Sequence, residues 1–442
     1  MTVLETRAPF DTFGAALTEI EAALPGHPLH AGRRAAFERF TAQGWPSMRD
    51  EAWKYTSLAT LARVSFTRAA TPGHITREAL RGLCFGETSF IELVFVDGRF
   101  APDLSRVVDL PSGAWVGSIA SAPPSLATVV AENLSEAEGA LDALNRALSE
   151  DGALVYVPRD ASLAAPVHLV FVATRHGSPV ATHPRNLLVV ESGASLDIIE
   201  SYVSDGAQVY FTDVVTEVVV GESARVHHYK LQREGGEAFH IADLRVRAAA
   251  HSTFQSFVVS TGGCLVRNEL HVPMEAEDTT CRAYGLMLLD NDQHCDAHLS
   301  IDHDRPHCTS EQIYKGIFDG RSHGVFSGRV KVAVDAQKTD AQQSSKNLLL
   351  SDDAVVTTRP QLEIHADDVK CSHGVAIGSL DETQVFYLRA RGIGPREARD
   401  ILTFAFASEL LTRIGVDAVR ADVERRIFAG LALDSRALRE EA

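Results

Sequence analysis

Hydrophobic positions in the first sixty residues recur at intervals of three and four, the spacing of an α-helix. The stretch FGAALTEIEAAL follows this spacing from Phe13, and AGRRAAFERFTAQG closes on Gly44, a residue type that often ends helices. We therefore expect residues 1–62 to form an N-terminal helical cap. Residues 63–152 mix short apolar runs such as FIELVFVDG with the helical stretch SLATVVAENLSEAEGALDALNRALSE, which predicts a small α/β region.

From residue 153 to about 380 the pattern changes to short runs of Val, Leu and Ile that are broken by Gly, Asp and Asn, as in β-strands. Similar segments recur at spacings of 28, 29, 28, 29, 30 and 30 residues. They begin at Ser195, Ser223, Ser252, Thr280, Thr309, Thr339 and Val369. A second strand follows about half a period later, for example TEVVV at 216–220, DLRVR at 243–247 and NELHV at 268–272. Two strands per coil of about 28–30 residues predict a flattened parallel β-helix, in which each coil is buried against its neighbours.

Residues 381–442 return to helical spacing. GIGPREARDILTFAFASELLTRIG has Pro395 near its start and stops at Gly415, and VDAVRADVERRIFAG repeats the pattern up to Gly430. We expect this C-terminal helical region to cover the open edge of the β-helix. Its outer face is a candidate docking surface, and a role as an edge cap alone is the alternative.

Composition and charge exclude several kinds of partner. The 442 residues are 45% hydrophobic, enough apolar material for about two to four structural units. Lys and Arg number 42 against 59 Asp and Glu, a net charge of −17, and no long basic run offsets it. Nucleic acid and anionic membranes are therefore not expected as partners.

The expected compartment is the cytoplasm. The opening MTVLETRAPFDTFGAAL carries acidic residues and no apolar segment of a signal peptide, and no apolar run reaches membrane-spanning length. Six cysteines are spread along the chain without a CxxC pair, at Cys84, Cys264, Cys281, Cys295, Cys308 and Cys371. This distribution favours free thiols over a disulfide framework.

The densest set of potential metal ligands is DNDQHCDAHLSIDHDRPHC, residues 290–308. Its imidazoles and thiols are those of His294, Cys295, His298, His303, His307 and Cys308. Such groups suit zinc or iron. However, there is no CxxC and no HxxxH on a helix, and strand alternation would divide the side chains between two faces. We therefore assign no metal ligand here, and a self-contained metal-binding enzyme that uses the His294–Cys308 cluster is the alternative function. The adjacent His227 and His228 would likewise point to opposite faces.

The stretch DDVKCSHG, residues 367–374, raises a different possibility. Cys371 and His373 stand two apart in a predicted strand, so their side chains share a face, with Cα atoms roughly 7 Å apart. That separation is loose for a nucleophile and its base. The pair could instead supply half of a metal or iron–sulfur site that a partner completes, with simple packing as the other interpretation.

Motifs of common enzyme classes are missing from the chain. It contains no GxxxxGK[ST] phosphate loop, no GxGxxG at a strand-to-helix junction and no GxSxG. Together with the large predicted β-helix, this favours a scaffold function.

Several long stretches resemble the SufB/SufD family of iron–sulfur cluster assembly proteins. The resemblance extends over about residues 311–393, with IYKGIFDGRSHGVFSGRVKVAVDAQ and DDVKCSHGVAIG among its clearest parts, and MRDEAWKYTSLATL at 48–61 supports it. It implies a mainly β fold, in which a right-handed parallel β-helix lies between helical N- and C-terminal regions. It also implies a protein that is not itself an enzyme and that acts with a SufB-like paralogue and a SufC-like ATPase.

The same resemblance assigns roles to particular residues. The histidine of the family motif lies at the interface with SufB and is implicated in cluster formation, and it corresponds here to His373. Cys371 is the neighbouring thiol of that motif. The SufC-docking helices of the family correspond to about residues 381–430. We therefore expect no cofactor bound tightly by the isolated chain and a transient iron–sulfur cluster at the partner interface. A homodimer through the same edge is an open alternative when the chain is alone.

Overall fold

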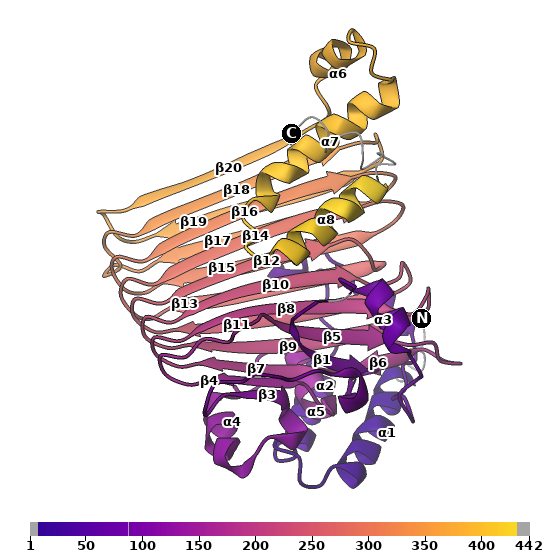
Figure 1. Ribbon diagram of the computed structural model, residues 1–442, viewed down its shortest axis with the longest axis vertical. Coiled ribbons are helices and arrows are strands. Elements are labelled where there is room, and N and C mark those ends of the chain that lie inside the picture. The colour runs from indigo at the N-terminus through magenta and orange to yellow at the C-terminus, as the bar shows by residue number, and fades with distance from the viewer. Residues whose placement is uncertain (1–7, 87, 431–442) are drawn as a thin grey trace.

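The computed structural model describes residues 8–86 and 88–430, in which eight α-helices flank a long β-structure (Figure 1). The helices are α1 (Ala8–Ala23), α2 (Arg33–Gln43), α3 (Arg77–Leu83), α4 (Ala127–Asn133), α5 (Ala140–Leu148), α6 (Glu382–Arg389), α7 (Pro395–Leu411) and α8 (Asp417–Gly430). Short 3₁₀ turns lie at Glu51–Trp53, Leu61–Arg63, Pro102–Leu104, Ile119–Ser121 and Pro124–Leu126. The helical stretch predicted from Ser125 to Glu150 is divided into α4 and α5 by residues 134–139, and Gly139, which precedes α5, has a φ of 88°.

The strands form two sheets. Sheet 1 has the order β2-β1-β5-β8-β10-β12-β14-β16-β18-β20, and sheet 2 has the order β19-β17-β15-β13-β11-β9-β7-β4-β3, with β6 beside β9. The strands of sheet 1 are β1 (Ile91–Val96), β2 (Arg99–Phe100), β5 (Val167–Ala173), β8 (Ser195–Ser204), β10 (Arg225–Arg233), β12 (Thr253–Ser260), β14 (Thr280–Leu289), β16 (Thr309–Phe318), β18 (Asp340–Leu349) and β20 (Lys370–Gly378). Those of sheet 2 are β3 (Trp115–Ser118), β4 (Ala153–Val157), β6 (Val180–Thr182), β7 (Arg185–Val190), β9 (Tyr210–Val220), β11 (Phe239–Ala248), β13 (Leu265–Met274), β15 (His294–His303), β17 (His323–Val332) and β19 (Val355–Ile364).

From β7 onward the chain passes alternately between the two sheets, and each strand pairs in parallel with the strand one coil away. This is a parallel β-solenoid of about eight turns, flanked by N- and C-terminal helices, which confirms the predicted fold class. The predicted first strands begin within two residues of β8, β10, β12, β14, β16, β18 and β20. The repeat predicted the coils because a regular register is needed to bury each coil against the next.

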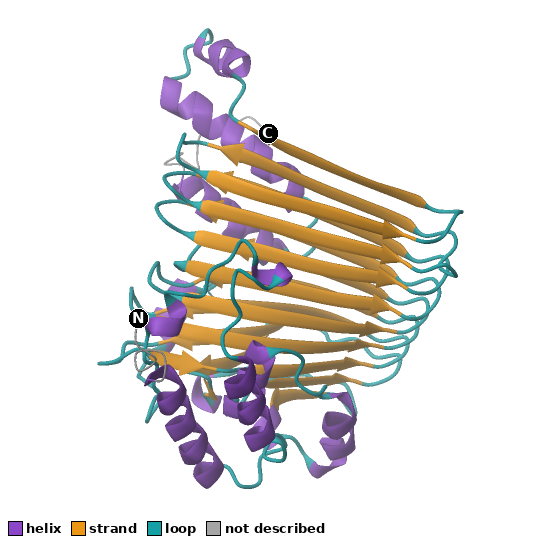
Figure 2. Ribbon diagram, turned by 180° about the vertical axis from the view of Figure 1, so that it is seen from behind, coloured by secondary structure: helices purple, strands orange, loops and turns teal. Residues whose placement is uncertain are grey.

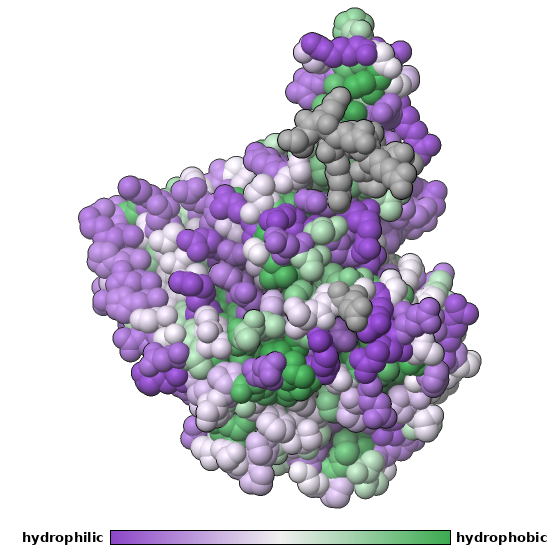
Figure 3. Space-filling view, viewed as in Figure 1, coloured by the Kyte–Doolittle hydropathy of each residue, from purple (hydrophilic) through white to green (hydrophobic). Residues whose placement is uncertain are grey.

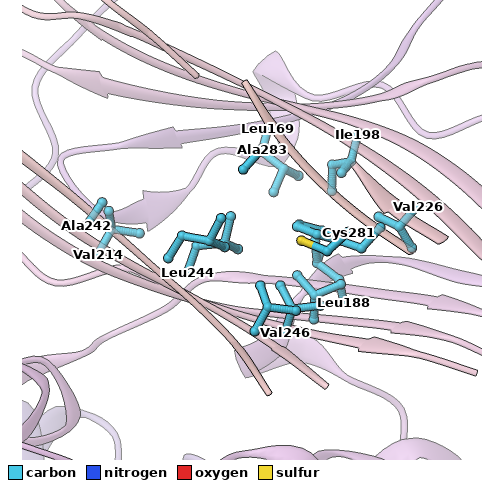
Figure 4. Close-up of a cluster of buried hydrophobic side chains, with 14 of the residues drawn as sticks. Leu169, Leu188, Ile198, Val214, Val226, Ala242, Leu244, Val246, Cys281 and Ala283 are labelled. Atoms are coloured by element: carbon cyan, nitrogen blue, oxygen red, sulfur yellow. The ribbon is translucent and has the colours of Figure 1, made fainter. Parts of the chain in front are cut away.

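Apolar side chains from the inner faces of both sheets fill the lumen of the solenoid. Figure 4 shows them pointing toward one another across it, with Ile198 and Val226 from sheet 1 facing Leu244 and Val246 from sheet 2. Strands within residues 63–152 take part as well. Ile91, a residue of β1, belongs to the same buried cluster, and β1 and β3 pair with β5 and β4.

The N-terminal helices pack on the outer face of sheet 2. Side chains of α1, α2 and α5 form one buried cluster with Phe211, Phe239 and Leu265 of the sheet. The chain that follows α2 then runs across sheet 2, as Figure 2 shows from behind, and Thr56 donates a hydrogen bond of 2.6 Å to Asp296 on β15. The N-terminal region thus packs against β9, β11 and β13 of the solenoid through its helices and contacts β15 through Thr56.

The C-terminal helices α7 and α8 pack on the outer face of sheet 1, where Figure 1 shows them lying across the strands. Their apolar side chains meet outward-facing residues of the sheet, including Tyr229, Phe257 and Tyr284. The expectation that this helical pair covers the open edge is therefore wrong. Helical periodicity identified an apolar face but not the surface that it meets, and the outer face of sheet 1 is apolar as well.

The rest of the surface is more polar. In Figure 3, hydrophilic residues dominate the turn side of the solenoid, at the left of the view. No helix in the described part of the chain is long and apolar enough to cross a membrane.

Candidate functional site: the open end of the solenoid

The last coil leaves two strands without neighbours on one side. In the described part of the chain, β20 pairs only with β18, and β19 pairs only with β17. Most residues of β20 are exposed, and those of β19 are exposed or half-buried. Unpaired backbone groups of this kind can add a further strand from another chain.

The register of β20 places Cys371 and His373 at the mouth of the lumen. Cys371 stands opposite Ala341 and His373 opposite Gln343, both of which are buried on the inner face of β18. Alternation then turns the two site residues toward the lumen, together with Val375. The prediction that Cys371 and His373 share one face of a strand agrees with this register.

The two residues have different surroundings. Cys371 is half-buried and packs beside a cluster that contains Val330 and Ala341, and burial raises the pKa of its thiol. A raised pKa keeps the thiol protonated at neutral pH, which is the opposite of an activated nucleophile. The His373 side chain is exposed, and no described residue forms a hydrogen bond with it. This arrangement lacks the contacts of a catalytic Cys–His pair.

Two stacked amides lie beneath His373. Gln312, Gln343 and His373 occupy the same register position on β16, β18 and β20. Gln343 Nε2 donates a hydrogen bond of 3.1 Å to Gln312 Oε1, and Gln343 Oε1 is buried without a hydrogen-bond partner among the described residues. A free acceptor therefore lies one coil below the imidazole, where it can accept a hydrogen bond.

Apolar side chains lie around Cys371 and His373. Val375 and Ile377 on β20 are 44% and 48% exposed, and Ile364 at the end of β19 is 40% exposed. Exposed large hydrophobic residues on an unpaired edge are typical of an interaction surface. The end of the solenoid thus combines an exposed imidazole, a thiol and an apolar rim, and it is open on the side away from β17 and β18.

The structure does not bring the His294–Cys308 cluster together. His294 and His298 face outward from β15, whereas Cys295 and His303 are buried on its inner face. Cys308 is buried in the following turn, with its sulfur 3.2 Å from the Ala276 carbonyl oxygen. Strand alternation accounts for this division.

Burial also alters the ionisation of these side chains. Burial raises the pKa of Cys295 to about 12. Burial and the positive charge of the neighbouring His323 lower the pKa of His294 to about 4. The Cys295 thiol is therefore protonated at neutral pH and is a poor metal ligand there.

A second exposed apolar feature lies on α6. Phe386 is 70% exposed and Tyr387 is 57% exposed, and the Arg391 guanidinium lies 3.7 Å from the centre of the Tyr387 ring. Figure 1 shows α6 standing beyond the last strands of the solenoid. This helix falls within residues 381–430, the region that the sequence resemblance assigns to docking.

The fold and the open end formed by β19 and β20 define the class of the molecule. It is a β-solenoid whose last coil presents an unpaired edge with the polar side chains of Cys371 and His373. Comparison with known families then places it more narrowly. Residues 171–406 match the core domain of SufBD proteins of the SUF system for iron–sulfur cluster assembly, and residues 11–169 match the N-terminal region of SufBD proteins. The chain belongs to the SufBD family of iron–sulfur cluster assembly proteins.

Individual relatives agree with this assignment. A SufBD-family iron–sulfur cluster assembly protein of Synechocystis is 36% identical over 84% of this chain and 84% of its own length. The iron–sulfur cluster assembly protein SufD of Escherichia coli is 33% identical over 87% of this chain and 89% of its own length. The chloroplastic protein ABCI7 of Arabidopsis thaliana is 34% identical over 91% of this chain and 86% of its own length. The resemblance noted in the sequence is confirmed at the level of the family.

One group of potential metal ligands was not predicted from the sequence. Asp243, Glu269 and His271 come together on the outer face of sheet 2. Asp243 and Glu269 occupy equivalent positions on successive coils, but the strand starts visible in the sequence do not give this register.

Proposed function

We propose that this chain is a non-catalytic scaffold subunit for iron–sulfur cluster assembly, acting in a complex with a SufB-like paralogue and a SufC-like ATPase. The observation that carries the proposal is the unpaired end formed by β19 and β20. A solenoid end can be completed by the end of a second solenoid, which would pair both edges and cover the apolar rim. A SufB-like paralogue is the expected occupant, and a second copy of this chain takes its place when the paralogue is absent.

In this complex His373 contributes half of an assembly site. Its exposed imidazole offers a ligand nitrogen or a proton-handling group to a cluster that forms across the interface, with the remaining groups on the partner. Cys371, half-buried beside it, is a second candidate. The cluster is cargo that leaves after assembly, and the isolated chain holds none tightly.

The SufC-like ATPase is proposed to dock on residues 381–430. Exposed aromatic residues on α6 and exposed charged residues at the start of α7 support this assignment, because aromatic and Arg side chains often anchor protein interfaces. The helices rest on sheet 1 through their other face, so this outer surface is available without unfolding.

The site proposal is tested by replacing His373 with Ala and reconstituting the complex with both partners. Cluster formation, followed by its visible absorption and by iron and sulfide content, should fall at least about tenfold while the complex remains intact on gel filtration. His365→Ala is the matched control, since His365 is also exposed but lies in the turn after β19. Normal cluster yield from an intact His373→Ala complex would disprove the role of His373.

The docking proposal calls for substitutions that do not disturb folding. Phe386→Ala, Tyr387→Ala and Arg396→Ala change exposed side chains of α6 and α7. At least one should weaken association with the SufC-like ATPase about tenfold, measured by calorimetry, while association with the paralogue is unaffected. Unchanged SufC affinity in all three variants and in their combination would refute docking on this surface.

A further inference from the structure

A charged groove of about 560 Å³ lies on the outer face of sheet 2 and extends from β9 to β17, the neighbour of β19. One wall includes Trp53 from the segment that crosses the sheet, and another comes from the chain before and within α5. Its floor is formed by residues of β9, β11, β13, β15 and β17. The proposed scaffold function uses none of these residues.

Three side chains converge on the floor of this groove. Asp243 on β11 stands opposite Glu269 on β13, and His271 lies two residues after Glu269 on the same face. His271 Nε2 is 3.4 Å from Glu269 Oε2 and 3.9 Å from Asp243 Oδ1. One ligand atom from each residue falls within 4.8 Å of the other two. Two carboxylate oxygens and one imidazole nitrogen at this spacing could contact a single ion.

Two arginines hold the carboxylates in this orientation. Arg245 donates to Asp243 Oδ2 from Nε at 2.8 Å and from Nη2 at 2.6 Å. Arg267 Nε donates to Glu269 Oε1 at 2.6 Å. Each carboxylate therefore uses one oxygen for an arginine and turns the other toward His271. Outer groups that orient ligands in this way are a regular feature of metal sites.

Asp243 supplies a second observation that points to a cation. Its Oδ1 atom is buried and has no hydrogen-bond partner among the described residues. The nearby His271 Nε2 lies 3.9 Å from this oxygen, beyond hydrogen-bond distance. A buried carboxylate oxygen without a hydrogen bond is unfavourable. This oxygen is the one that faces His271, so a cation bound between them would satisfy it.

We propose that Asp243, Glu269 and His271 bind a divalent first-row transition-metal ion through Oδ1, Oε2 and Nε2. The imidazole ligand favours Zn²⁺ or Fe²⁺ over Mg²⁺ or Ca²⁺, and the two carboxylates neutralise the charge of the ion. His298, which stands opposite Glu269 on β15, or water from the groove supplies a further ligand. This proposal differs from the expectation that the chain has no metal ligands of its own, and the titration below decides between them.

The experiment uses the full untagged chain without partners, so its result does not depend on the scaffold proposal. The chain is stripped with a chelator and titrated with Zn²⁺ by calorimetry, and with Fe²⁺ in the absence of oxygen. We expect one tightly bound ion per chain. Asp243→Asn and His271→Gln should each weaken binding at least tenfold. His227→Gln is the matched control, because His227 pairs with a single exposed carboxylate, Asp197, at 2.9 Å; it should bind as the wild type does.

Two further measurements keep the test decisive if a variant folds poorly. Circular dichroism of the metal-free variants checks folding, and X-ray absorption of the zinc-loaded wild type identifies the ligands directly. Nitrogen and oxygen ligands without sulfur support the proposal. Failure of the stripped wild type to bind either ion, sulfur among the ligands, or wild-type affinity in both Asp243→Asn and His271→Gln would overturn it.

Discussion

Inside the solenoid, the ring of Tyr314 occupies space that a side chain at Gly285 would need. A Cβ atom at position 285 would lie 2.0 Å from Tyr314 Cε1, and Tyr314 is buried within the lumen. At Gly374 on β20, by contrast, a Cβ atom would meet nothing within 4 Å. The two glycines therefore separate the effect of lumen packing from the general effect of a glycine substitution in a strand.

We predict that Gly285→Ala lowers the free energy of unfolding by about 1–3 kcal/mol, the range typical of overpacked cores. Gly374→Ala should leave it unchanged within about 0.5 kcal/mol or raise it slightly. Urea unfolding of both variants measures the difference. Equal stability of the two variants would show that the lumen can rearrange around Tyr314.

A second residue-scale prediction concerns acid sensitivity. His303 faces the lumen, where its Nε2 is hydrogen-bonded to Ser310 Oγ at 2.8 Å, and burial lowers its pKa from 6.5 to about 4. Between pH 6.5 and pH 4 the unfolded chain therefore binds a proton that the folded chain does not, so stability falls as the pH falls through this window. This group should account for a loss of about 2 kcal/mol between pH 7 and pH 5.

The pH dependence of the unfolding free energy, measured with urea at several pH values, provides the check. His303→Gln should flatten the curve between pH 7 and pH 5, whereas His365→Gln, at an exposed position, should leave its slope unaltered. A slope that His303→Gln does not change would mean that His303 is not neutral in the folded chain.

At the scale of elements, the repeat predicted the positions of the strands but not the register in which they pair. The segments DLRVR and NELHV, compared at their starts, place Asp243 beside Asn268. The structure pairs Asp243 with Glu269 instead. A shift of one residue moves every side chain to the other face, which is why the Asp243–Glu269–His271 group was missed.

The C-terminal helices show another limit of element-scale prediction. Pro395 and Gly415 predicted the bounds of a helix, and α7 begins at Pro395 and ends at Leu411. Which surface the helix covers depends on a contact distant in sequence. Lys315 on β16 is buried and donates hydrogen bonds of 2.6 Å to the Phe406 carbonyl oxygen and to Glu409. No local pattern reveals such a contact.

We predict that Lys315→Met loosens α7, because it removes the charged donor to a helix carbonyl, a loss of about 1–2 kcal/mol. Hydrogen exchange should become faster in α7 while the lumen strands keep their protection. Lys346→Met is the control, since Lys346 lies 4.0 Å from the same Glu409 but its side chain is 48% exposed. Unchanged exchange in α7 of Lys315→Met would argue that apolar contacts alone hold the helix.

At the scale of the whole molecule, the sequence predicted a solenoid between helical regions, and the period of the repeat was sufficient for that. It did not predict that the last coil would remain open. The strands β19 and β20 carry the same alternation as buried strands, and exposure depends on whether another coil follows. His373 was singled out through family resemblance. The structure places it, exposed, on the unpaired strand β20 at the open end of the solenoid.

The last prediction concerns assembly through this end. Val375 lies on the inward face of β20 and is 44% exposed, so Val375→Glu would place a charge at the mouth of the lumen. If a SufB-like paralogue covers the mouth, the charge must lose its water on association, and affinity should fall at least tenfold. Self-association of the isolated chain, measured by analytical ultracentrifugation, should weaken in parallel.

The control for this variant is Val108→Glu. Val108 is also 44% exposed but lies in the N-terminal part of the chain, before β3, so the same charge is added away from the open end. Both variants should unfold at the same urea concentration as the wild type, because both side chains are already in contact with water. Association that is lost in Val375→Glu and retained in Val108→Glu locates the interface at the last coil. Equal affinities of the two variants for the paralogue would place the interface elsewhere, and His373 would then lie on a free surface, with no partner to complete its site.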